Sequence, residues 1–144
     1  MKLSSWKALL KLGLSLALCS CGSGKSATAP VAVAPTLSSI QQQIFTPGCA
    51  LPSCHSSAAR RGGLVLEAGH AYAQLVNIPA ENDSAKAARK LRVVPGHPEQ
   101  SFLIDKLSSL KAGEGSLMPY TGNLLPASQI EAIRTWIQRG ASAD

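Results

Sequence analysis

The chain has 144 residues, of which 15% are charged, and a formal net charge of +6. This length is enough for one small domain. Three of its basic residues, Lys2, Lys7 and Lys11, lie in an N-terminal segment that we expect to be removed, which leaves a net charge of about +3 on the mature chain. So small an excess of positive charge gives no support to nucleic-acid binding.

Residues 1–20 are typical of a lipoprotein signal peptide, because basic residues accompany an apolar run over 9–18. That run is shorter than the about 20 residues that span a bilayer. It ends in the residues Leu-Cys-Ser-Cys-Gly (18–22), which resemble a bacterial lipobox centred on Cys21. We therefore expect lipid on Cys21, with an ordinary cleaved signal as the alternative. Gly22 in place of Asp favours the outer membrane, by analogy with enterobacterial lipoproteins.

The segment after Cys21 is predicted to be a flexible tether. Residues 22–36 are mainly Gly, Ser, Ala, Pro and Val, with Lys25 as their one charged side chain, and cannot bury a core. As a coil they would span about 20 Å. Lipid and tether together occupy residues 21–36. We expect the globular domain over 37–141, followed by a short tail at 142–144.

The first helix of the domain is predicted over residues 38–45, from its apolar spacing. Ser38 and Gln41 offer a capping box at its start, and Pro47-Gly48 is expected to end it. An extended piece over 64–66 follows. This order places the helix directly before a cysteine-bearing segment.

The middle of the chain predicts short elements. A short helix is expected over 71–76, and residues 79–90 are polar and small enough to suggest a surface loop. Pro98 is suited to the first turn of the next helix. That helix would bury Phe102, Leu103, Ile104 and Leu107.

The last helix has the clearest pattern. Ser128 and Glu131 form a capping box at its start, and Gly140 is placed to end it. No alternating pattern of strand length is visible in the mature chain, so the domain is predicted to be all-α. The apolar stripe of this helix consists of Ile130, Ile133, Trp136 and Ile137.

The segment from Cys49 to Cys54, followed at once by His55, carries the strongest functional signal. Two thiols with a histidine directly after the second are typical of covalent haem attachment, in which the imidazole binds the iron. The usual spacing is C-x-x-C-H, whereas four residues separate these thiols. Met118, before Pro119, supplies a thioether of the kind that is the sixth ligand in electron-transfer haems.

With these residues, the chain over 44–141 resembles class I c-type cytochromes, especially bacterial lipoprotein mono-haem cytochromes with a C-x4-C-H motif. The resemblance implies a cytochrome c-like fold whose N- and C-terminal helices pack around a covalently bound haem c. It implies thioether links at Cys49 and Cys54, and His55 and Met118 as the two axial ligands of the iron. The phrases that carry it are Ile44-Phe45-Thr46-Pro47, Gly63-Leu64, Ala71-Tyr72, Leu75-Val76, Val94-Pro95-Gly96-His97-Pro98, Met118-Pro119 and Trp136-Ile137.

The resulting prediction is a monomeric electron carrier, tethered by lipid in the periplasm of a Gram-negative bacterium and working with redox protein partners. We do not expect an enzyme, because a single haem motif cannot build a two-haem peroxidase. No Ser-His-Asp set, carboxylate pair or phosphate-binding loop is visible in the sequence.

Two alternatives remain open from the sequence. One is a haem sensor or binding module with five-coordinate iron, in which Met118 only packs in the core. The other is a haem-free lipoprotein stapled by a disulfide between Cys49 and Cys54, which an oxidising periplasm permits. His70 and His97 are rival sixth ligands.

Basic residues gather in the middle of the chain and near the haem motif. They suggest either a solvated surface or a docking surface for an acidic redox partner, where charge would speed encounter. They are Lys86, Arg89, Lys90 and Arg92, with Arg60 and Arg61.

Overall fold

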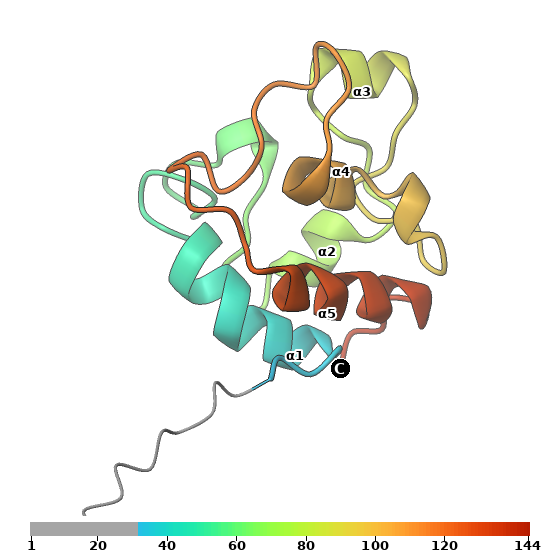
Figure 1. Ribbon diagram of the computed structural model, residues 1–144. Coiled ribbons are helices and arrows are strands. Elements are labelled where there is room, and N and C mark those ends of the chain that lie inside the picture. The colour runs from blue at the N-terminus through green and yellow to red at the C-terminus, as the bar shows by residue number, and fades with distance from the viewer. Residues whose placement is uncertain (1–31) are drawn as a thin grey trace, which may run out of the picture. The chain divides into compact units, whose positions relative to one another are not determined.

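The computed structural model describes residues 32–144, which Figure 1 shows in colour. The predicted signal peptide (1–20), the lipidation at Cys21 and the tether as far as residue 31 lie outside the described residues. The end of the predicted tether is described, and Val33 packs there against the hydrophobic core. Packing against the core therefore begins a few residues before position 37.

The first helical stretch consists of α1 (Leu37–Ile40) and, directly after it, a π-helical segment, η1 (Gln41–Cys49). The prediction that Pro47-Gly48 ends this helix is wrong, because helical structure continues through both residues. The rule assumes an α-helix, in which the proline ring clashes with the carbonyl four residues earlier. In η1 the hydrogen bonds instead span five residues, and the last one runs from Ala50 N to Phe45 O (2.7 Å).

The N-cap of α1 lies two residues before the predicted one. Thr36 is the N-cap, and its side-chain oxygen accepts a hydrogen bond from Ser39 N (3.3 Å). The expected capping box of Ser38 and Gln41 is therefore wrong. Hydroxyl residues occupy three neighbouring positions here, and the sequence pattern does not distinguish which one caps the helix.

Two short helices follow in the middle of the chain. The predicted helix over 71–76 is confirmed as α2 (Ala71–Leu75). The predicted loop over 79–90 is wrong in part, because it contains α3 (Asp83–Ala87). The Asn82 side chain caps α3 by accepting a hydrogen bond from the backbone N–H of its third residue (3.0 Å).

The helix expected to start at Pro98 is divided into two. Pro98 opens a 3₁₀ turn, η3 (Pro98–Gln100), and α4 (Phe102–Ser108) begins after it. Ser101, which separates them, is fully buried; its hydroxyl donates to His97 O (2.9 Å) and accepts from Val94 N (2.9 Å). The break therefore satisfies backbone groups that a continuous helix would not reach.

The last helix, α5 (Ala127–Gln138), is confirmed, but it starts without a side-chain cap, so the capping box of Ser128 and Glu131 is wrong. Its predicted end at Gly140 is confirmed. The N–H groups of Gly140 and Ala141 donate to carbonyls of the last turn (2.9 and 3.0 Å) in the pattern of a Schellman motif.

The described chain is all-α, with five α-helices and no strands among residues 32–144, only isolated bridges. Figure 1 shows α1 and α5 side by side, and α4 also contacts α5. None of the helices within residues 32–144 has both the length and the apolar character needed to cross a membrane. The centre of the core consists of fully buried side chains from η1, α2 and α5: Ile44, Phe45, Leu75, Ile133, Trp136 and Ile137.

Candidate functional site

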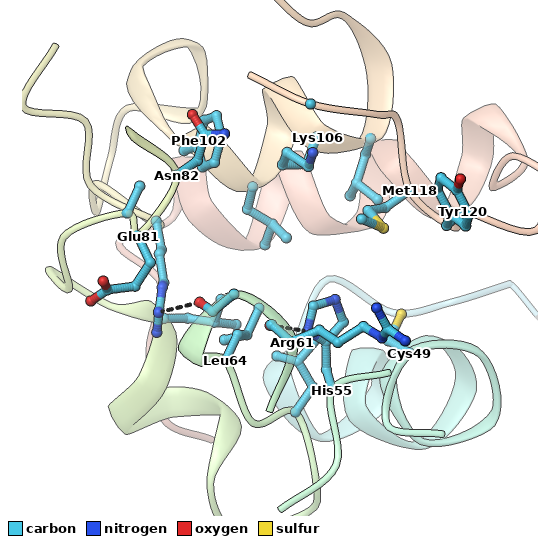
Figure 2. Close-up of a pocket in the computed structure, with 18 of the residues that line it drawn as sticks. Cys49, His55, Arg61, Leu64, Glu81, Asn82, Phe102, Lys106, Met118 and Tyr120 are labelled. Atoms are coloured by element: carbon cyan, nitrogen blue, oxygen red, sulfur yellow. Dashed lines mark hydrogen bonds between the residues drawn. The ribbon is translucent and has the colours of Figure 1, made fainter. Parts of the chain in front are cut away.

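A cavity of about 470 Å³ opens between two walls (Figure 2). One wall contains the motif loop, residues 49–64, and the other contains α4 and the distal loop, residues 109–118. The volume falls within the about 300–1,000 Å³ typical of cofactor sites. Most of the lining is apolar, and it includes Ile44, Phe45, Leu75, Phe102, Leu107 and Ile133.

The motif loop is closed by its own backbone. His55 N donates to Cys49 O (3.0 Å), and Cys54 N donates to Leu51 O (2.9 Å). Arg61 N donates to Cys54 O (3.1 Å), so backbone hydrogen bonds hold the loop both before and after the histidine. Residues close in the sequence therefore fix the place at which the His55 ring leaves the backbone.

The His55 ring is oriented by a backbone carbonyl. Its Nδ1 lies 3.0 Å from Arg61 O, and because a carbonyl can only accept, Nδ1 carries the hydrogen. Burial lowers the pKa of His55, as do the charges of Arg92 and Lys106, against the opposing effect of its backbone acceptors. The ring is thus neutral at neutral pH, and Nε2 keeps the lone pair that binds metal ions.

The two thiols differ in their surroundings. Cys49 lines the cavity, and burial together with the neighbouring Cys54 raises its pKa to about 11. Cys54 is half-buried and is not part of the cavity lining; its Sγ lies 3.8 Å from Ser53 Oγ. Both cysteines are free. The structure therefore brings Cys49 and His55 to the cavity but leaves Cys54 out of its lining.

Met118 lies on the wall opposite His55. Its backbone N–H donates to Lys106 O (2.7 Å), which fastens the end of the distal loop to α4. The half-buried side chain packs against the core and lines the cavity. Figure 2 shows His55 and Met118 entering the cavity from its two walls. An imidazole nitrogen and a thioether sulfur can thus face a group held between them.

The rival histidines are placed elsewhere. His70 precedes α2 and is exposed, and His97 is exposed and lies 3.2 Å from Glu99. Neither is part of the cavity lining. Within residues 32–144, no group of three or more His, Cys, Asp and Glu side chains is arranged to hold a metal ion.

The basic cluster of the sequence is divided by the fold. Lys86 and Arg89 are exposed, whereas Arg92 is only 6% exposed and Lys90 is largely enclosed. Arg92 lines the cavity together with Lys106, a residue that the sequence did not single out. Burial lowers the pKa of Lys106, with Glu114 acting in the opposite direction. Of the two readings left open, a solvated surface or a docking surface, either can apply to Lys86 and Arg89, whereas the buried Arg92 fits neither.

Comparisons with protein-family models, curated proteins and solved structures found no match for this chain. The arguments about its function therefore rest on the residues themselves. Of the four residues predicted to bind haem, the fold brings three to one cavity: Cys49, His55 and Met118.

Proposed function

We propose that this protein is a mono-haem c-type cytochrome that carries single electrons in the periplasm, tethered to a membrane by lipid on Cys21. One observation carries the proposal: His55 and Met118 face each other across an apolar cavity that Cys49 also lines. Histidine and methionine together are the axial pair of electron-transfer cytochromes c. When bound, the haem would supply an iron that alternates between ferric and ferrous states.

The residues present fit a haem. The neutral His55 ring offers a lone pair on Nε2, and its Nδ1–H bond to Arg61 O is the contact that orients metal-binding histidines. The lining is mainly apolar, which suits the porphyrin faces. Arg92 and Lys106 bring positive charge to the same cavity, where they would favour the two haem carboxylates.

The thiols fit covalent attachment in two ways. In each link the sulfur would bond to one vinyl carbon and the thiol hydrogen would pass to the other. Cys49 lies at the cavity, and three residues between the thiols, Leu51, Pro52 and Ser53, are exposed. The two residues beyond the usual spacing can therefore bulge toward solvent. Cys54 directly precedes His55 in the chain but is not part of the lining, so its side chain would have to turn toward the cavity to reach a porphyrin.

The walls around the proposed haem have a physical role in electron transfer. Apolar side chains exclude water from the iron, so the same two ligands can stay bound in both oxidation states. The neutral thioether of Met118 adds no charge to offset the ferric state, which raises the reduction potential relative to bis-histidine iron. No proton transfer or substrate conversion is required of any residue in the cavity.

The decisive experiment is an absorption spectrum of the mature protein, oxidised and reduced, after expression with a cytochrome c maturation system. Sharp low-spin c-type bands, with the weak far-red band of methionine-ligated ferric iron, are expected. A high-spin spectrum with ready carbon monoxide binding would favour the five-coordinate sensor. No haem absorption, in a host that matures other c-type cytochromes, would leave the lipoprotein with a Cys49–Cys54 disulfide.

The membrane tether needs a separate experiment, because it rests on the sequence of the first 21 residues. Replacing Cys21 by Ser should move the haem protein from the membrane fraction to the soluble periplasmic fraction. Replacing Cys19 by Ser is the matched control and should leave it in the membrane. If both variants stay in the membrane fraction, lipid at Cys21 is not the anchor.

A further inference from the structure

The segment 90–93 occupies a central position in the domain. Its backbone is bonded on one side to the chain before α3, through Arg92 N to Ile78 O (2.7 Å). On the other side, Phe102 N and Leu103 N donate to Leu91 O (3.0 Å) and Arg92 O (2.9 Å) at the start of α4. Hydrogen bonds on both sides hold this segment like the middle strand of a small sheet.

One side chain of this segment reaches the motif loop. The Arg92 guanidinium donates to three backbone carbonyls: Gln74 O (2.8 Å), Gly62 O (3.1 Å) and Gly63 O (3.2 Å). Gly62 directly follows Arg61, whose carbonyl accepts from the His55 ring. The contact therefore joins the two peptide groups that follow the Arg61 carbonyl to the centre of the domain.

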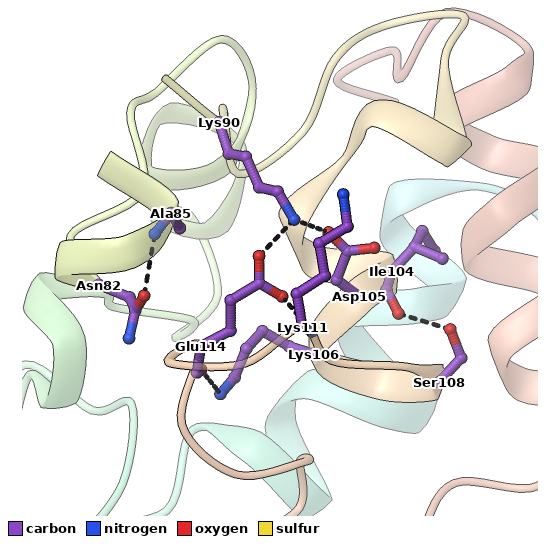
Figure 3. Close-up of polar contacts among 9 residues, drawn as sticks. All are labelled: Asn82, Ala85, Lys90, Ile104, Asp105, Lys106, Ser108, Lys111 and Glu114. Carbon is purple, nitrogen blue, oxygen red and sulfur yellow. Dashed lines mark hydrogen bonds and ion pairs between the residues drawn. The ribbon is translucent and has the colours of Figure 1, made fainter. Parts of the chain in front are cut away.

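The side chain two residues earlier is joined to the distal loop. Lys90 Nζ donates to Asp105 Oδ2 (2.7 Å) and to Glu114 Oε1 (2.5 Å), as Figure 3 shows. The Glu114 side chain is only 3% exposed, and its second oxygen accepts from Lys111 N (2.8 Å). One buried carboxylate thus receives hydrogen bonds from within the loop and from the segment 90–93.

A second lysine completes the attachment of the distal loop. Lys106 Nζ donates to Glu114 O (3.1 Å) and Ser116 O (2.5 Å), and Lys106 O accepts from Met118 N. The loop is therefore fastened at both ends of residues 114–118. Its attachments converge on α4 and on Lys90 (Figure 3).

We propose that Lys90 and Arg92 are positioning residues that set the separation of the two iron ligands. Arg92 acts through the carbonyls of Gly62 and Gly63, which directly follow the Arg61 carbonyl that orients His55, and Lys90 acts through Glu114 and the distal loop that carries Met118. This inference rests on the proposed function. The two side chains leave the same segment two positions apart, so this segment links the motif loop to the distal loop.

The energetics favour an effect on geometry as well as on stability. Burial disfavours the charged form of Lys90, but the hydrogen bonds to Asp105 and Glu114 outweigh it and raise its pKa. The hydrogen bond from Lys90 lowers the pKa of Glu114 despite burial. The pair is therefore ionised at neutral pH. Removing Lys90 leaves the buried Glu114 carboxylate with only the hydrogen bond from Lys111 N, which favours movement of the loop toward water.

The experiment compares holo-protein variants by three readings: the far-red band of the ferric form, the reduction potential, and the rate of carbon monoxide binding to the ferrous form. Lys90→Gln should weaken the band and raise the carbon monoxide rate at least tenfold, with haem still attached. Glu114→Gln, a smaller change on the same contact, should act in the same direction if Lys90→Gln does not mature. Lys90→Arg, which keeps the positive charge, should retain the far-red band at the wild-type strength.

Arg92→Gln tests the contact between the segment 90–93 and the motif loop. It should alter the reduction potential while the Met118 band remains, because the contact that it removes acts on the His55 side. The charge-matched control is Lys86→Gln, at an exposed position four residues away from Lys90. The stability control is Ile137→Val in the buried face of α5, outside the cavity lining.

The outcomes separate the two proposals. A wild-type protein without haem overturns the proposed function, and the inference with it. Suppose instead that the wild type binds haem with methionine ligation. The inference alone is then overturned if Lys90→Gln, Glu114→Gln and Arg92→Gln give the same three readings as Lys86→Gln. Equal changes in Ile137→Val also overturn it, because loss of stability would then explain the effect.

Discussion

The motif loop and the distal loop present their candidate ligands by different means. In the motif loop, His55 is placed by backbone hydrogen bonds to Cys49 and Arg61, residues at most six positions away. In the distal loop, Met118 depends on Lys106 and, through Glu114, on Lys90, which is 24 positions from Glu114. The hydrogen bonds that place His55 directly are local, with Arg92 adding a long-range contact to the two residues after Arg61, whereas those of Met118 require the folded domain.

This difference predicts an order of assembly. Contacts between residues close in the sequence cost little loop-closure entropy, so the motif loop can form early and receive the haem. The distal loop gains its contacts only when α4 and the segment 90–93 are in place. Loss of His55 should therefore prevent attachment of the haem. Loss of Met118 or of its loop contacts should instead leave the haem attached and change its ligation and reduction potential.

The largest effect is expected from His55→Ala. The variant lacks the proximal nitrogen, and we expect haem content per protein to fall at least tenfold, measured by absorbance of the denatured protein. His70→Ala is the control, because His70 is exposed and outside the cavity. Equal haem content in the two variants would contradict the assignment of His55.

A smaller change is expected from Met118→Ala. The haem should stay covalently attached, the sixth position should open, and the reduction potential should fall on the order of a tenth of a volt. Spectroelectrochemistry and carbon monoxide binding measure both changes. An unaltered spectrum and potential would exclude Met118 as a ligand.

A pair of glycine variants compares the stability of the two loops directly. Gly62 in the motif loop and Gly113 in the distal loop both have positive φ, +62° and +83°. A β-carbon at Gly62 meets nothing, whereas one at Gly113 overlaps the Ser84 hydroxyl. Gly62→Ala should cost about 1 kcal/mol of unfolding free energy, and Gly113→Ala about 2–3 kcal/mol. Chemical denaturation measures both; equal costs would show that the distal loop adapts freely.

The smallest effect is expected when the pH is lowered, and it concerns the Glu114 carboxylate. The hydrogen bond from Lys90 lowers the pKa of Glu114 below its ordinary value of 4.5, despite burial. A carboxyl of this kind stabilises the folded state above its unfolded pKa, and that contribution is lost as the pH falls through its lower folded pKa. The far-red band should therefore fade in that acidic range, with a shallower pH dependence in Glu114→Gln. Identical acid profiles would show that Glu114 does not hold the distal loop.

The sequence predicted best the features that depend on neighbouring residues. The apolar stripe of α5 and its end at Gly140 depend only on residues within that helix and its last turn, and both were confirmed. The helix α3 was missed because Asp83–Ala87 has no apolar stripe, although Asn82 offered an N-cap signal. The π-helical register of η1 has no signature in the residues of Gln41–Cys49 that these rules detect.

The residues of the candidate site also divide into those that the sequence predicted and those that only the fold identifies. Its proposed ligands were found from spacing, and His55 and Met118 do line one cavity. Lys90, Arg92 and Glu114 were missed as buried residues, because charged side chains are mostly exposed and only long-range contacts reverse that tendency. The basic cluster showed that positive charge was present, but its division between surface and interior required the fold.

The wide turns of η1 have a consequence for the helical phase of the chain. Because Ala50 N bonds to Phe45 O rather than to the carbonyl of residue 46, the chain leaves the helix one residue later than an α-helical register would allow. One residue corresponds to a rotation of about 100° around an α-helix axis. The register of η1 thus determines the direction in which the Cys49 thiol points. Deleting one residue between Phe45 and Cys49 would therefore turn the thiol away from the cavity without removing any residue that lines it.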